Sequence, residues 1–103
     1  MTTQSVTVTG VGVSVALLLD TNNANGKVGV FLDMGAVCTG TVEITPDDPA
    51  GAAPTWYPTG VAVLTGATTD VAAELPIPAR AIRLNQTVGA PASTLKIVTA
   101  GLI

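Results

Sequence analysis

The chain has 103 residues, of which 48% are hydrophobic and 11% are charged, against about 25% charged in an average soluble domain. Seven acidic and four basic residues give a net charge of −3, which leaves too few cations for a nucleic-acid-binding surface. Histidine is absent and Cys38 is the single cysteine, which excludes Ser–His and Cys–His catalysis, an internal disulfide framework and a cysteine-rich zinc site. We therefore expect one domain that is not an enzyme, holds no cofactor or metal and binds no nucleic acid.

The apolar stretches of the chain are too short for a membrane-spanning helix. The longest mostly apolar stretch, Val11 to Leu19, falls short of the about 20 residues that a spanning helix needs. No Lys or Arg precedes it, so the charged region of a signal peptide is missing. We expect the chain to fold in the host cytoplasm without cleavage or insertion.

Short strands are predicted along the first half of the chain, because its many Thr and Val residues suit a pleated surface. Val6 and Val8 alternate with hydroxyl residues in a first strand, and residues 1–9 form an arm or an edge strand. The two-residue repeat continues through 11–19, where three consecutive leucines predict a stretch buried on both faces. A turn is predicted over 20–26, which ends in Asn-Gly.

The rest of the chain continues the pattern. A hairpin is predicted over residues 27–45, and the four prolines of the 46–58 segment predict a loop. Further strands are predicted over 61–64, 79–87 and 94–102, whereas 71–75 is ambiguous, because the two prolines after it indicate either an edge strand or a bend. Seven or eight short antiparallel strands predict an all-β fold, a single jelly-roll-like β-sandwich over residues 1–103. Periodicity leaves an immunoglobulin-like strand order open.

Two acidic segments are candidate sites, and turns are the favoured interpretation of both. Asp20 and Asn22 occupy the first and third positions of a calcium-binding pattern, but Ala24 occupies the fifth. Asp47 and Asp48 precede a proline, which is typical of a turn. We expect these two carboxylates to pair with Arg80 or Arg83 rather than to act in catalysis.

The aromatic residues Trp56 and Tyr57 suggest either a carbohydrate platform or structural packing. We favour packing, with Trp56 filling one end of the sandwich and Tyr57 forming a hydrogen bond near the loop. The lone Cys38 is expected to be a small buried apolar residue.

The high hydrophobic content favours a protein that works by binding a partner, because large exposed apolar patches mark interfaces. The expected contact segments are the amino-terminal strand, the 46–58 loop and the carboxyl end. The candidate contact residues are Val6, Val8, Trp56, Tyr57, Arg83, Leu102 and Ile103.

Three segments, Gly40–Pro49, Pro54–Pro58 and Ala81–Asn85, together carry a resemblance to a known family. In this order they resemble small β-sandwich virion structural proteins of tailed bacteriophages. The resemblance implies a capsid decoration (cement) protein that binds the head shell and stabilises it. Its implied partners are the major capsid protein and further copies of itself, as a dimer or trimer on the virion surface. The alternatives are a tail, neck or fibre component, or a β-sandwich module that binds a glycan or receptor.

Overall fold

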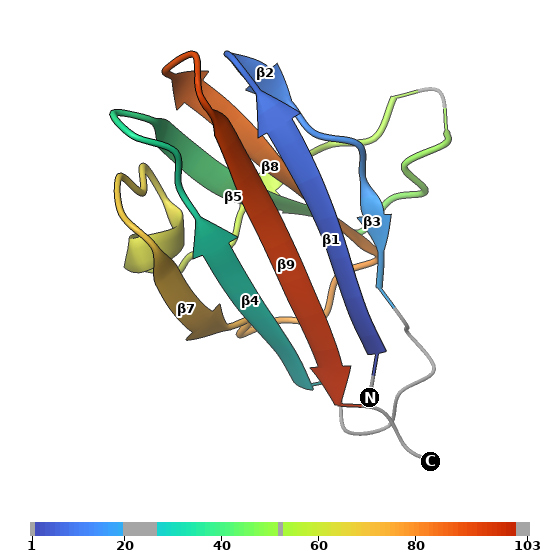
Figure 1. The fold of residues 1–103 in the computed structure, drawn as a ribbon. Coiled ribbons are helices and arrows are strands. Elements are labelled where there is room, and N and C mark those ends of the chain that lie inside the picture. Colours follow the sequence, from blue (N-terminus) through green and yellow to red (C-terminus); the bar gives the residue numbers. More distant parts are fainter. Residues whose placement is uncertain (1, 20–26, 52, 101–103) are drawn as a thin grey trace.

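A computed structural model describes residues 2–19, 27–51 and 53–100 (Figure 1). Within these residues the chain forms nine strands and one 3-10 turn. They are β1 (Thr2–Thr9), β2 (Gly12–Val13), β3 (Leu17–Leu18), β4 (Lys27–Asp33), β5 (Thr39–Thr45), β6 (Tyr57–Pro58), η1 (Ala62–Leu64), β7 (Val71–Glu74), β8 (Ala81–Val88) and β9 (Ala92–Ala100).

The strands form two antiparallel sheets that pack face to face, which confirms the predicted β-sandwich (Figure 1). Sheet A has the order β1-β9-β4-β7, and sheet B has the order β2-β8-β5-β6, with β3 also paired to β8. When β2 and β3 are counted as one interrupted strand, the first strand pairs with the last, the second with the last but one, and so inward to β5 with β6. This nested order is that of a jelly roll, in which one long hairpin is wound into a sandwich.

Alternating residues of both sheets fill the core between them. In β4 the predicted inward face is confirmed, since Val28, Val30 and Leu32 are buried. Sheet B and β9 contribute equally regular inward rows, and the fully buried aliphatic residues there are Val42, Ile82, Leu84, Leu95 and Ile97. Cys38 is also buried, as expected.

The predicted hairpin over residues 27–45 is wrong, because β4 lies in sheet A and β5 in sheet B. The chain crosses between the sheets at the connection after β4. A Cβ on Gly35 would lie 2.6 Å from the carbonyl oxygen of Ala92, so the chain there packs directly against the start of β9. The Gly35 N–H also donates to Ser93 Oγ at 3.0 Å, which fixes the crossover. The alternation of apolar and polar residues therefore predicted the positions of both strands, but not which strands they pair with.

The burial predicted for the three consecutive leucines is confirmed only in part, since Leu19 is buried and Leu17 is half-buried against the core but Leu18 is not buried. Val11, Val13 and Val15 are 50–76% exposed, and Leu18 is 60% exposed. Gly10 adopts a positive φ of 79° at the end of β1, and this turn changes which residues of the following segment face inward. The predicted strand over 61–64 contains the 3-10 turn η1 instead, because a short apolar run without alternation does not distinguish the two conformations.

The remaining predicted elements have these outcomes. Of the two alternatives for 71–75, the structure has the edge strand, β7, and the two carboxyl-terminal strands are confirmed as β8 and β9 with shifted bounds. The loop over 46–58 ends in the short edge strand β6, which includes Pro58. The turn over 20–26, with its calcium-like pattern, lies outside the described residues.

Gln86 holds together the turns at the end of the sandwich where β1 and β8 finish. Its side chain is fully buried, and its Nε2 group lies 3.0 Å from Gly10 O, 3.1 Å from Gly89 O and 2.8 Å from Pro91 O. One buried amide therefore links the β1–β2 turn to the β8–β9 turn.

Candidate interaction surface

The outer face of sheet B has a charged pair at its centre. Glu43 of β5 and Arg83 of β8 are register partners, so both side chains project from the same face. Arg83 Nε donates to Glu43 Oε1 at 2.8 Å, and the two side chains are only 22% and 18% exposed. Asn85 Nδ2 also approaches the carboxylate, at 3.4 Å from Oε2.

Trp56 covers this pair from the segment that leads into β6. The Arg83 Cζ atom lies 4.2 Å from the centre of the Trp56 ring, which is the geometry of a cation–π contact. Trp56 is therefore not a plug at the end of the sandwich, as expected from the sequence, but a half-buried cover on an outer face. We call the Glu43–Arg83 ion pair, together with the Trp56 ring that covers it, the tryptophan-covered pair.

A strip of exposed aliphatic side chains runs along the sheet edge beside this pair. We call Val11, Val13, Val15 and Leu18 the valine strip. Val13 is paired in register with Asn85, and Leu18 with Ala81, so the middle of the strip lies beside Arg83 on β8. The two-residue repeat in the sequence puts Val11, Val13 and Val15 on one face, but it does not show that this face is exposed.

Buried Ser14 is the reason that the neighbouring valines face outward. Its N–H donates to Leu84 O at 2.8 Å, and its Oγ accepts the Leu84 N–H at 2.9 Å. Ser14 therefore takes the inward position in the irregular stretch between β2 and β3, and Val13 and Val15 on either side of it are exposed.

The Asp47–Asp48 segment forms a turn, as predicted. Asp48 Oδ1 accepts the Ala50 N–H at 3.0 Å, and Asp47 Oδ2 accepts the Thr55 N–H at 2.8 Å. Of the two arginines considered as partners, Arg80 is the one near Asp48, at 4.0 Å, and both of these side chains are 55% exposed. The partner of Arg83 is Glu43, which the sequence reasoning did not consider.

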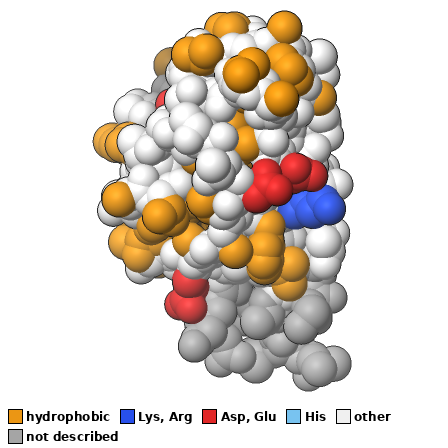
Figure 2. Space-filling view, turned by 60° about the vertical axis from the view of Figure 1, so that its left-hand side comes forward, with side chains coloured by type: hydrophobic (Ala, Val, Ile, Leu, Met, Phe, Trp, Pro, Cys, Tyr) orange, Lys and Arg blue, Asp and Glu red, His pale blue; other side chains and the backbone are white. Residues whose placement is uncertain are grey.

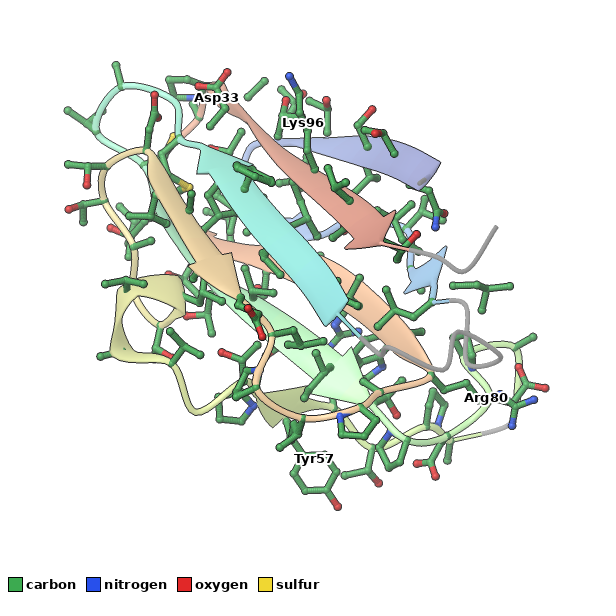
Figure 3. The ribbon with its side chains drawn as sticks, turned by 90° about the horizontal axis from the view of Figure 1, so that it is seen from below. Asp33, Tyr57, Arg80 and Lys96 are labelled. Carbon is green, nitrogen blue, oxygen red and sulfur yellow. The ribbon has the colours of Figure 1, made fainter. Side chains whose placement is uncertain are left out.

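Tyr57 and Trp56 face opposite sides of sheet B. Tyr57 is paired with the inward-facing Ile44, whereas Trp56 lies over the outward-facing Arg83. Tyr57 lines a small apolar groove together with Pro46, Ile77 and Pro78. Tyr57 and Arg80 lie on the side of the molecule opposite Asp33 and Lys96 (Figure 3). The two neighbouring aromatic rings therefore do not form a common platform.

The remaining candidate contact residues are those of the amino-terminal strand and the carboxyl end, and the structure does not place those of the strand at an exposed contact surface as expected. Val8 is buried and is not available to a partner, whereas Val6 is half-buried against the core and is available only in part. The strand that carries them, β1, lies at the edge of sheet A in full register with β9, and is an edge strand rather than an arm. Leu102 and Ile103 lie outside the described residues.

The outer face of sheet A carries a shallow apolar hollow. It is lined on its outer side mainly by Gly29, Phe31, Ala72 and Val98, with Glu74 at its rim. Figure 2 shows hydrophobic side chains gathered on this side of the molecule, with acidic and basic side chains together beside them. The Phe31 ring leaves little room above Gly29, where a Cβ would lie 3.2 Å from the ring.

The described residues contain no group of three or more His, Cys, Asp or Glu side chains placed to hold a metal ion. Among the same residues, no helix has the length and hydropathy to cross a membrane. No protein-family model matches the chain, and neither a curated protein nor a solved structure is significantly similar to it.

Proposed function

We propose that this chain is a structural protein of a tailed-phage virion, a capsid decoration protein that binds the head shell and stabilises it. The observation that carries the proposal is the meeting of three segments in sheet B. Two of the segments that resemble virion proteins are close together in sequence and the third, 81–85, is distant from them, yet all three contribute to the neighbouring strands β8, β5 and β6. Each contributes one residue to the tryptophan-covered pair: Glu43, Trp56 and Arg83. The resemblance is thus concentrated on one surface.

The valine strip beside this pair supplies the contact area. Four exposed aliphatic side chains in one strip are costly to leave in water, at roughly 25 cal/mol for each Å² that a partner would cover. The rigid cation–π pair next to the strip offers an orienting polar contact of the kind found in binding hot spots. The partner in this proposal is the major capsid protein, and the chain acts on the virion surface after folding in the host cytoplasm.

A glycan-binding role is less well supported than shell binding. Aromatic sugar sites use rings that share one face, and Trp56 and Tyr57 face opposite sides of sheet B. The proposal contains no enzymatic step and no cofactor.

The proposal is tested by co-sedimentation of the purified chain with head shells from which it has been removed. The variants Val13→Asp and Val15→Asp should weaken binding at least about tenfold, because each places a charge within an apolar contact. Val63→Asp is the matched control, since Val63 is 48% exposed but belongs to η1, away from the strip. Failure of the wild-type chain to bind stripped shells would overturn the proposal, and equal loss in the control would reject the strip as the contact.

A further inference from the structure

The four sheet edges of this molecule are very unequal in length. β1 has eight residues and is paired with β9 on one side only, in eight consecutive register pairs without a bulge. The opposite edge of sheet A, β7, has four residues. The edges of sheet B consist of the two-residue strands β2, β3 and β6. β1 is thus the longest regular edge among the described residues.

The edges also differ in how well they are protected against pairing with a strand of another molecule. Natural proteins guard exposed edges with charges, prolines, bulges or short strands, because a free row of backbone groups recruits another strand. Asp70 precedes β7, Glu74 is its last residue and Pro76 follows it, while β6 contains Pro58. β1 has the sequence TTQSVTVT, which contains neither a charge nor a proline. The β2–β3 edge is protected only by the shortness of its two strands, so among the described strands β1 is the long edge that lacks protection.

We propose that β1 pairs antiparallel with β1 of a second copy, across a two-fold axis, so that two four-stranded sheets become one continuous sheet. The inference specifies the self-contact within the proposed virion function and rests on that function only for its biological setting. A two-fold contact uses both unguarded edges and closes. Pairing of β1 with β7 of another copy would instead leave one β1 open and extend into a filament.

The side chains of β1 are compatible with pairing to the β1 strand of a second copy. Thr3, Ser5 and Thr7 are exposed on the outer face, and Thr7 Oγ1 already lies 3.0 Å from Thr94 Oγ1 on the neighbouring strand. A second β1 would continue this row of hydroxyl groups. On the inner face Val6 is only half-buried, and a second strand beside it would cover it further.

Charge does not oppose this pairing. The charged residue facing β1 across sheet A is Lys96, whose register partner is Ser5. In the pair, the two copies of Lys96 would be separated by at least three strand spacings, about 14 Å. This exceeds the Debye length of about 8 Å at physiological salt, so their repulsion is largely screened.

The test is the molar mass of the purified chain, measured by sedimentation equilibrium across a range of concentrations. The wild type should approach twice the monomer mass of 10.2 kDa. The double variant Thr3→Glu/Thr7→Glu should raise the dissociation constant at least about tenfold, because paired β1 strands would then bring like charges together. The control Val63→Glu/Ala72→Glu adds the same charge at exposed positions of η1 and β7 and should leave the dimer intact.

Two further readouts separate this inference from its rivals. In a β1 dimer, alternate β1 amides should gain protection from hydrogen exchange as the concentration rises, whereas another interface would protect a different segment. A wild type that stays monomeric, or a dimer without β1 protection, overturns the inference. Shell binding is measured separately, so a monomer that binds shells leaves the proposed function standing, and a β1 dimer that binds none contradicts only that function.

Discussion

Ser14 and Leu84 are joined by a reciprocal pair of backbone-directed hydrogen bonds, 2.8 Å from Ser14 N to Leu84 O and 2.9 Å from Leu84 N to Ser14 Oγ. The serine hydroxyl thus supplies an acceptor that a regular strand would supply from its backbone. Because Ser14 faces inward, Val13 and Val15 are exposed. A small polar residue in the core therefore creates the apolar strip on the surface.

Ser14→Ala should lower the free energy of unfolding by about 1–3 kcal/mol, because the buried Leu84 N–H loses its acceptor. Urea denaturation measures the change. Thr65→Ala is the control, since the Thr65 hydroxyl also forms a hydrogen bond to the backbone, donating to Val61 O, but is exposed. An equal loss in the two variants would contradict the role given to Ser14.

The Glu43–Arg83 pair should show a coupling free energy of about 1–2 kcal/mol in a double-mutant cycle, because the two side chains are largely shielded from solvent and aligned. The Asp48–Arg80 pair is the natural comparison, at 4.0 Å and 55% exposure of both side chains. Its coupling should be below about 0.5 kcal/mol. Similar couplings for the two pairs would show that the Trp56 cover does not strengthen the inner one.

Trp56→Ala should cost about 1–2 kcal/mol of stability, from the lost cation–π contact and the lost cover. This is less than the about 3–5 kcal/mol expected of a fully buried tryptophan. Trp56→Phe retains a ring and should recover part of the loss. Chemical denaturation of the wild type and the two variants measures both effects. A loss of about 3–5 kcal/mol in the Ala variant would show that Trp56 is a core residue and not a cover on the outer face.

Gln86→Leu should destabilise the fold by about 2–4 kcal/mol, because the carbonyl groups of Gly10, Gly89 and Pro91 lose a shared donor. Gln86→Glu should be worse at neutral pH, since it turns a carboxylate toward three carbonyl oxygens. Thermal melts of both variants make the comparison. Greater stability of the Glu variant would contradict the donor role of this amide.

Alternation predicted most strands and their buried faces, as in β4, because a two-residue period is visible in a single segment. It did not predict partners. The residues 27–45 were expected to form a hairpin, although the backbone at Gly35 fits closely against Ala92 and directs the chain into the second sheet. Such a contact joins residues far apart in sequence, and local pattern does not contain it.

The same limit applies to the candidate site. Glu43 between Val42 and Ile44, and Arg83 between Ile82 and Leu84, both show outward-facing positions in strands. That signal was present, but only the β5–β8 register shows that these two residues oppose each other. The valine strip was not predicted, because the two-residue repeat through Val11, Val13 and Val15 does not show which face of the segment is exposed.

The proposed decoration role is tested most directly by quantitative mass spectrometry of purified virus particles, which counts copies of this chain against copies of the major capsid protein. The account predicts a copy number comparable to that of the major capsid protein. A few copies per particle would indicate a neck, tail or fibre position and contradict the decoration role. Absence from the particles would contradict any structural role in the virion.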